Sequence, residues 1–285
     1  MIAVLLALAA ALFYGASDFL AGWLSRRVDY ARVGLVSQLS AAGGTLLASA
    51  IVGGDTGRSG LTWGAISGLG GGLGTLALYR GLGRGRMSVV APLSGVLAAG
   101  IPALFGLATG ERPSAVAGLG LALALPAVWL VSAAGVNEGE PADVASVVDG
   151  ALAGLGFAVL FIGLQRAGRS SGLWPTMTSQ VTSALVMLLV QLGRAAGPGA
   201  PSPAMQPARL AWAGPIATGA IGAAAILCFF LATRQGLLSV VAVLTSLYPA
   251  FTVALARWLL AERIGRRQGA GLALAAIAVV LLSAS

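Results

Sequence analysis

Long hydrophobic stretches alternate with short polar breaks along the whole chain. Each stretch holds about 20 residues, the length that an α-helix needs to cross the ~30 Å hydrocarbon core of a membrane. The first half of the pattern predicts spans at Ile2–Gly22, Arg32–Val52, Leu61–Tyr79, Met87–Thr109 and Ser114–Ala134. The second half predicts spans at Ser146–Gln165, Trp174–Gly193, Leu210–Phe230, Leu237–Leu260 and Arg267–Ala284. The chain is therefore predicted to be an all-α integral membrane protein with ten transmembrane helices.

The second half of the chain repeats the first. At an offset of 151 residues, 21 of the 47 positions from 88 to 134 are identical, whereas composition alone would give about eight. A repeat of five spans crosses the membrane an odd number of times, so the second copy must enter from the opposite side. We therefore expect two inverted-topology repeats of five helices, residues 1–136 and 146–285, joined by an acidic connector at 137–145. Many secondary transporters have this architecture.

Composition excludes several classes of chemistry. The 285 residues are 58% hydrophobic and 9% charged, histidine is absent, and all 17 basic residues are arginine. Without histidine or lysine, the chain has no imidazole base, no HExxH zinc site and no P-loop. We predict no catalytic residue, no metal site and no cofactor. The net charge of +8 comes from arginines at the predicted membrane edges, which favours contact with lipid headgroups over nucleic acid.

Several short motifs carry a family resemblance. Leu78-Tyr79-Arg80-Gly81-Leu82 is followed by Ser88-Val89-Val90-Ala91-Pro92-Leu93, and Gly110-Glu111-Arg112 and Ala261-Glu262-Arg263 close the fourth span of each copy. With the span count, these motifs resemble the EamA family of the drug/metabolite transporter superfamily. The resemblance implies a secondary transmembrane transporter of small metabolites, amino acids or drugs that works by alternating access. Efflux is the expected direction, and a proton is the candidate coupling ion.

Asp18 is interpreted as the one acidic residue of the nine that lies inside a predicted span. An ionisable group in hydrocarbon costs at least ~2.5–3.5 kcal/mol and is a functional candidate by default. A carboxyl group in this position could exchange a proton as cargo moves. The alternative is a structural pair with Arg26 or Arg80, and the sequence leaves both open.

Other candidates for contact with a substrate are polar or helix-breaking residues. Gln38 and Gln180 occupy matching positions in the second span of each copy, where they could bind a polar solute or fasten neighbouring helices. Arg80 could hold an anionic group or extend to the lipid headgroups. The remaining candidates near the expected cavity are Tyr14, Tyr79, Pro92, Tyr248 and Pro249. Glu111 and Glu262 are expected to form local ion pairs with the arginine that follows each of them.

The expected partners are a small-molecule substrate and the lipid bilayer, with the protein acting as a monomer or homodimer. The alternative is a non-transporting membrane subunit or receptor of a larger complex. Twelve of the 17 arginines fall on loops of one side, which by the positive-inside rule places both termini outside the cytoplasm. The family that the chain resembles usually has both termini inside. Abundant arginine, alanine and glycine without lysine favours a GC-rich bacterial genome, and hence the bacterial inner membrane.

Overall fold

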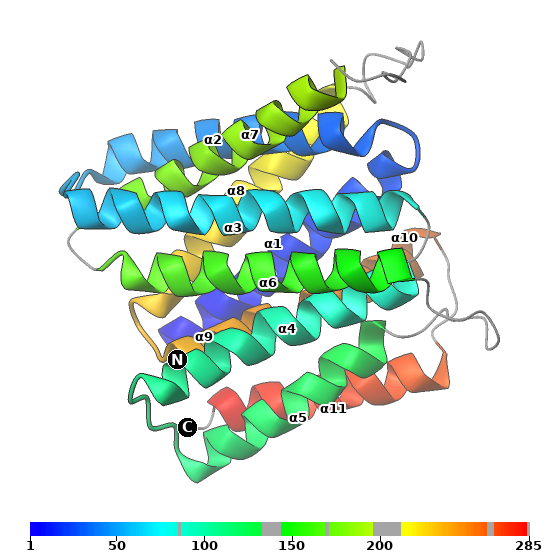
Figure 1. Ribbon diagram of the computed structural model, residues 1–285. Coiled ribbons are helices and arrows are strands. Elements are labelled where there is room, and N and C mark those ends of the chain that lie inside the picture. The colour runs from blue at the N-terminus through cyan, green and yellow to red at the C-terminus, as the bar shows by residue number, and fades with distance from the viewer. Residues whose placement is uncertain (85–86, 133–143, 169–170, 196–211, 261–264, 284–285) are drawn as a thin grey trace.

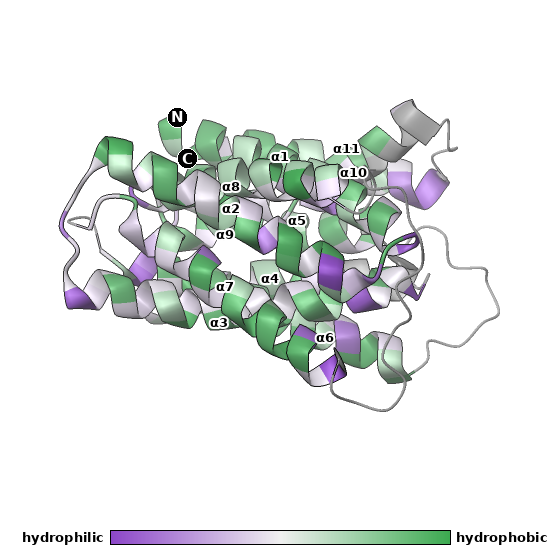
Figure 2. Ribbon diagram, turned by 90° about the horizontal axis from the view of Figure 1, so that it is seen from above, coloured by the Kyte–Doolittle hydropathy of each residue, from purple (hydrophilic) through white to green (hydrophobic). Residues whose placement is uncertain are grey.

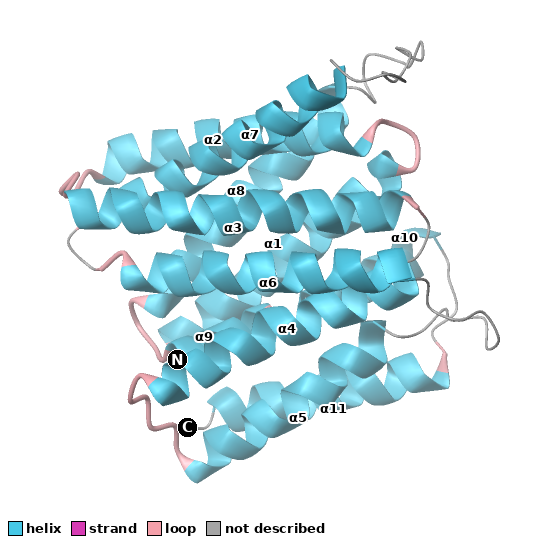
Figure 3. Cartoon of the chain, viewed as in Figure 1, coloured by secondary structure: helices cyan, strands magenta, loops and turns pink. Residues whose placement is uncertain are grey.

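The computed structural model describes residues 1–84, 87–132, 144–168, 171–195, 212–260 and 265–283. The helices of the first half are α1 (Ile2–Ser25), α2 (Tyr30–Val52), α3 (Arg58–Gly83), α4 (Met87–Ala108) and α5 (Ala115–Ser132). Those of the second half are α6 (Val144–Arg166), α7 (Trp174–Ala195), α8 (Gly214–Thr233), α9 (Leu238–Thr245), α10 (Tyr248–Leu260) and α11 (Arg266–Ser283). Across these ranges the chain forms helices joined by short loops, with no strand (Figure 3).

The helices have the length and composition of membrane spans. Within the described ranges, seven of them are long and apolar enough to cross a membrane: α1, α2, α3, α6, α7, α8 and α11. Three shorter apolar segments, Leu93–Ala108, Ala115–Val131 and Leu238–Thr252, account for the remaining predicted spans. Hydrophobic residues cover the lengths of the helices, and hydrophilic ones gather toward their ends (Figure 2). The prediction of an all-α integral membrane protein is confirmed.

The helices run alongside one another, and both chain termini lie at the same end of the bundle (Figure 1). We call this the termini end; it also carries the loop at 53–57 between α2 and α3. The opposite end carries Arg26 and Arg27 after α1, Arg84 after α3 and Arg194 in the last turn of α7. We call it the arginine-rich end.

Helices of the two halves interleave rather than forming separate bundles. α3 packs against α6 and α7, and α8 packs against α1 and α2. Two further pairs, α2 with α7 and α5 with α11, join corresponding helices of the two halves at opposite edges of the molecule (Figure 1). By order along each half, the counterparts are α1 and α6, α2 and α7, α3 and α8, and α5 and α11. Exchanging each of these helices for its counterpart leaves this set of packed pairs unchanged.

Two glycines let helices of opposite halves approach until their backbones touch. A Cβ atom on Gly68 of α3 would collide with the main-chain oxygen of Ser179 in α7. A Cβ atom on Gly219 of α8 would collide with the main-chain oxygen of Ser37 in α2. The two glycines are 151 residues apart and the two serines occupy matching positions of the repeat. Small residues at such contacts are what allow close packing in a membrane.

The predicted ninth span is broken in the structure. The sequence pattern predicts one helix over Leu237–Leu260, but α9 ends at Thr245 and α10 begins at Tyr248. Pro249 explains the break, because its ring clashes with the carbonyl group four residues earlier in a continuous helix. That residue is Thr245, the last of α9. The predicted ninth span therefore consists of two short helices.

The acidic connector predicted at 137–145 lies for the most part outside the described residues. Its last two positions, 144 and 145, belong to α6, which begins at Val144. The helix thus starts two residues earlier than the predicted span at Ser146. The division of the chain into two repeat domains remains a prediction.

Replacing either contact glycine by alanine should loosen the bundle. We expect Gly68→Ala and Gly219→Ala each to cost about 1–3 kcal/mol, the usual range for overpacking, because each new methyl group meets a backbone oxygen. Thermal unfolding of the purified protein in detergent measures the effect. Gly118→Ala in α5 is the matched control, since a Cβ atom there meets nothing within 4 Å. Equal unfolding temperatures for Gly68→Ala and Gly118→Ala would contradict this account of the packing.

Candidate functional site

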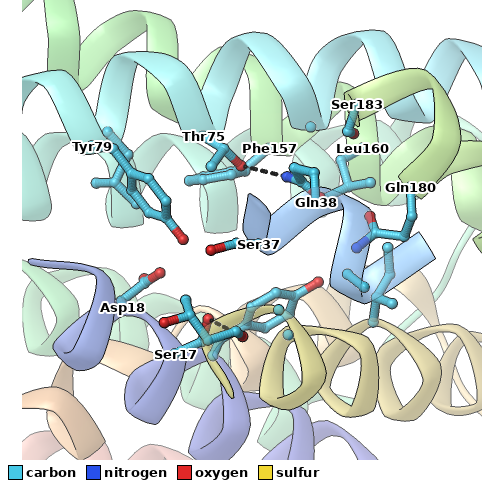
Figure 4. A pocket seen from close by; sticks show the side chains of 18 of the residues that line it. Ser17, Asp18, Ser37, Gln38, Thr75, Tyr79, Phe157, Leu160, Gln180 and Ser183 are labelled. Atoms are coloured by element: carbon cyan, nitrogen blue, oxygen red, sulfur yellow. Dashed lines mark hydrogen bonds between the residues drawn. The ribbon is translucent and has the colours of Figure 1, made fainter. Parts of the chain in front are cut away.

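A cavity lies inside the bundle where helices of both halves meet. Its volume is about 70 Å³, room for a few water molecules rather than for a large solute. Walls come from α1, α2 and α3 of the first half and from α6, α7 and α8 of the second, with one residue of α10 (Figure 4). The polar lining residues are Tyr14, Ser17, Asp18, Ser37, Gln38, Thr75, Tyr79, Gln180, Ser183, Thr218 and Tyr248.

Six of the nine residues that the sequence singled out line this one cavity. They are Tyr14, Asp18, Gln38, Tyr79, Gln180 and Tyr248. These residues lie up to 234 positions apart in the sequence, and the packing of five helices brings them together. The other three, Arg80, Pro92 and Pro249, are not among the lining residues. Pro92 lies within α4, but its side chain falls outside the described residues.

Asp18 provides the charge of the cavity. It lies ~10 Å from the Ser25 end of α1 at 1.5 Å per residue, well inside the span. Its carboxylate makes no hydrogen bond or ion pair with any described residue. In particular, Arg80 pairs elsewhere, so the structural pair of Asp18 with Arg80 that the sequence left open is not formed. An acidic group with no cation beside it can take a proton or a cationic solute group as its partner.

Hydroxyl groups surround Asp18. Figure 4 shows the side chains of Tyr79 and Ser37 directed into the same space as Asp18. The hydroxyl groups of Tyr14 and Ser37 are buried and have no hydrogen-bond partner among the described residues. Ser17 is satisfied, because its hydroxyl donates to the main-chain oxygen of Thr218 at 3.1 Å. Buried hydroxyl groups without partners are costly, so a bound water or solute would stabilise this part of the cavity.

The two amides take different roles in the structure. Gln38 Nε2 donates to Thr75 Oγ1 at 3.3 Å, which ties α2 to α3 beside the cavity (Figure 4). Gln180 lines the cavity from α7 and is 7% exposed. Gln38 thus both fastens helices and faces the cavity, so the two readings that the sequence offered for it are compatible.

One wall of the cavity is apolar and aromatic. Phe157, Leu160 and Phe161 of α6 line it. Phe161 stacks on Phe229 of α8, with ring centroids 4.2 Å apart, and the ring of Tyr14 lies 6.3 Å from that of Phe161. The cavity thus combines polar groups from both halves with an apolar wall from α6.

Comparison with known proteins agrees with this architecture. The model of the EamA-like transporter family matches residues 146–284, which span α6 to α11. The second half of this chain belongs to the EamA-like transporter family. That family is part of the drug/metabolite transporter superfamily, so the resemblance inferred from the sequence motifs is confirmed. No curated protein matches the chain.

Solved structures share the fold over nearly the whole chain. Fifteen chains match. One of them, titled "Crystal structure of protein", covers 98% of this chain and 95% of its own length with a TM-score of 0.75. Sequence identity to it is 17%, so the likeness shows the fold alone. The arrangement of both halves together therefore resembles that of a solved structure.

Arg80 forms an ion pair with a buried carboxylate, which joins the first half to the EamA-like half. Its Nη2 and Nε atoms both donate to Oδ1 of Asp149, the latter at 2.9 Å. Arg84 Nη1 donates to Oδ2 of Asp149 at 3.1 Å. The side chain of Asp149 is fully buried, whereas those of Arg80 and Arg84 are 33% and 48% exposed. This contact with Asp149 was not among the roles predicted for Arg80.

Sequence reasoning missed Asp149. It lies three residues inside the predicted span Ser146–Gln165, so the interpretation of Asp18 as the one acidic residue within a span is wrong. Its position inside that predicted span was the signal in the sequence that could have identified it. Its partners on α3 are far away in sequence and could not be assigned without the structure.

Glu111 also joins the first half to the EamA-like half. Its carboxylate accepts hydrogen bonds from the backbone N–H groups of Leu238 and Ser239, at 2.7 and 2.9 Å. Those groups belong to the first turn of α9, where backbone donors lack partners within the helix. Arg112 donates to the main-chain oxygen of Glu111 instead of to its carboxylate. The predicted local ion pair at Glu111 is therefore wrong, while Glu262 lies outside the described residues.

Two substitutions distinguish the contact of Glu111 with α9 from a local ion pair with Arg112. We expect Glu111→Ala to destabilise the protein by about 2 kcal/mol, because two charge-assisted hydrogen bonds to α9 are lost. Arg112→Ala should change stability by no more than ~0.5 kcal/mol, since its side chain is exposed. Thermal unfolding in detergent compares the two proteins. If the two substitutions cost the same, a local ion pair describes Glu111 better than its contact with α9.

Proposed function

We propose that this chain is a secondary transporter that carries a small solute through the cavity by alternating access of residues 1–136 and 146–285. The single observation that supports it most is the position of Asp18, which faces a cavity between the halves without an ion-pair partner among the described residues. Membership of the second half in a transporter family supports the same function. We further propose efflux as the direction, and the bacterial inner membrane as the location of a monomer or homodimer.

The chemistry of the cavity favours solutes with a protonated amino group and an apolar part. Asp18 would bind the cationic group, and the phenol groups of Tyr14, Tyr79 and Tyr248 can contribute hydrogen bonds and ring faces. The hydrophobic wall formed by Phe157 and its neighbours would receive the apolar part. A proton and the solute would compete for one carboxylate, which is the basis of proton-coupled exchange.

The pairing of helices supports the inverted repeat on which alternating access depends. The contacts of Gly68 with Ser179 and of Gly219 with Ser37 are related by the same offsets as the sequence repeat. Helix pairs exchange into one another in the same way. Two copies that bind each other through equivalent surfaces can exchange conformations, so that the cavity opens first to one side and then to the other.

The halves are joined by different contacts at the two ends of the bundle. At the arginine-rich end, Asp149 pairs with Arg80 and Arg84, and Arg194 Nη2 donates to Asp29 Oδ1 at 2.9 Å. At the termini end, Glu111 binds the first turn of α9. Opening the cavity to one side would require the contacts at that end to break while those at the other end hold.

Asp18→Asn should abolish coupling to the pH gradient and should weaken, without abolishing, binding of the solute. We expect a solute that stabilises the wild type in a thermal-shift screen of amino acids, sugars, nucleosides and cationic drugs to accumulate in proteoliposomes under a pH gradient. Asp18→Asn should lose this gradient-driven accumulation by tenfold or more, as an amide cannot carry the proton, while solute exchange without a gradient persists. Radiolabelled uptake measures both.

Asp55→Asn serves as the control, because Asp55 is an exposed loop carboxylate far from the cavity lining. It should transport like the wild type. The coupling role of Asp18 would be rejected if Asp18→Asn accumulates solute under the gradient as the wild type does. Transport itself would be rejected if no member of the panel stabilises or accumulates in any of the three proteins.

Weakening the contacts at each end should expose the cavity to opposite sides. Cys228 is the single cysteine, so a Cys228→Ser background with Ser37→Cys places one reporter thiol in the cavity wall. We expect Asp149→Asn to raise the labelling rate by a membrane-impermeant thiol reagent about fivefold from the arginine-rich end, the factor that ~1 kcal/mol corresponds to. Glu111→Gln should raise it by a similar factor from the termini end.

Labelling rates in inside-out and right-side-out vesicles distinguish the two sides. Asp55→Asn in the same background should leave both rates unchanged. The proposal fails if both variants raise labelling from the same side, or if neither changes it.

A further inference from the structure

A groove on the outer surface of the bundle runs between α3 of the first half and α6 of the second. Its volume is about 460 Å³. Walls are formed by Leu69, Leu73 and Leu76 of α3 and by Leu152, Leu155 and Val159 of α6. Leu73 is 54% exposed and Leu155 is 49% exposed, so the side chains of both walls border the space that lipid occupies around a membrane protein. The groove is separate from the cavity that contains Asp18.

Close approach of the two helices creates the groove. A Cβ atom on Gly70 would lie 2.6 Å from the main-chain oxygen of Gly156, so the two backbones touch at these glycines. Neighbouring leucines on each helix extend past this contact toward the outside. The glycines thus form the floor of an apolar groove, and the leucines form its two flanks.

A cationic cluster closes one end of the groove. Arg80 is itself a lining residue, and with Arg84 it surrounds the single carboxylate of Asp149. Two guanidinium groups and one carboxylate leave a net charge of +1. The Nη1 atom of Arg80 makes no hydrogen bond with a described residue, and both arginines remain partly exposed. Guanidinium groups bind phosphate oxygens through paired N–H donors.

The distance along α3 between the arginines and the leucines matches the thickness of one membrane leaflet. Leu69 and Arg80 are eleven residues apart on one helix, which at 1.5 Å per residue is ~16 Å. One leaflet of the ~30 Å hydrocarbon core is ~15 Å thick. The arginines at the end of α3 therefore lie near the depth of the headgroups, and the leucines lie at the depth of the acyl chains.

We propose that this groove binds one anionic phospholipid, with an acyl chain between the leucines and the phosphate group at Arg80 and Arg84. An acyl chain fits the apolar flanks, and the net positive charge favours an anionic headgroup over a zwitterionic one. Since α3 and α6 belong to different halves, the bound lipid contacts both of them. The site does not depend on the transport proposal.

Ligands that differ in headgroup charge or in the presence of acyl chains test the site. Delipidated protein in detergent is titrated with dioleoylphosphatidylglycerol, with dioleoylphosphatidylcholine and with glycerol 3-phosphate, and retention is measured by native mass spectrometry. We expect phosphatidylglycerol to bind about fivefold more tightly than phosphatidylcholine, the factor that ~1 kcal/mol for one arginine near an anionic group corresponds to. Glycerol 3-phosphate alone should neither be retained nor displace the lipid.

Substitutions in the groove and at its arginines test where the lipid binds. Leu73→Trp and Leu155→Trp fill the groove from either flank and should each lower phosphatidylglycerol binding about tenfold. Arg84→Gln should remove the preference for phosphatidylglycerol over phosphatidylcholine. Leu104→Trp is the matched control, because Leu104 lies on α4, is 68% exposed and does not line the groove; its binding should equal that of the wild type.

Circular dichroism and elution volume show that each variant is folded, and two groove-filling variants guard against misfolding of one. Equal binding of the two phospholipids by the wild type would overturn the proposal. So would equal binding by both groove-filling variants and the Leu104→Trp control. Displacement of phosphatidylglycerol by glycerol 3-phosphate would show a simple anion site and would also overturn it.

Discussion

Close backbone contact between helices of opposite halves is the constraint on which the rest of this molecule depends. Lipid tails are as apolar as leucine, so hydrophobic burial does not drive these helices together, and packing at small residues must do so. Gly68 and Gly219 supply two such contacts, and Gly70 against Gly156 supplies a third. The outer groove lies over the contact of Gly70 with Gly156, and Gly219 lines the inner cavity beside its contact with Ser37.

Much of the fold and part of the candidate site could be predicted from the sequence. The lengths of the hydrophobic stretches located the spans to within a few residues, because the thickness of the membrane fixes those lengths. Asp18 and the tyrosines stood out because polar groups are rare in hydrocarbon. Pro92 and Pro249 were both singled out as helix-breaking residues, but the helix is broken only at Pro249, whereas α4 continues through Pro92. The difference depends on neighbouring helices, which local sequence does not reveal.

Side-chain contacts between segments that are distant in sequence were the hardest feature to predict. Glu111 has an arginine beside it in sequence, but its carboxylate binds α9, 127 residues away. Arg80 ends a span in the manner of an arginine that reaches the headgroups, but a buried carboxylate on α6 holds it. The repeat gives no help here, because the backbone contacts are duplicated while Asp18 and Arg80 have apolar counterparts, Ala158 and Leu231, in the second copy. The sequence repeat therefore does not extend to the charged residues Asp18 and Arg80.

The ion pairs at the arginine-rich end have a property that follows from their composition. Both the cluster around Asp149 and the pair of Arg194 with Asp29 use arginine as the cation, and a guanidinium group keeps its charge throughout the physiological range. Loss of a proton from the cation therefore cannot separate these groups. What can replace a carboxylate as partner is hydration or a competing anion from solution. Ionic strength and the entry of water, rather than alkalinity, would thus set how easily this end of the bundle comes apart.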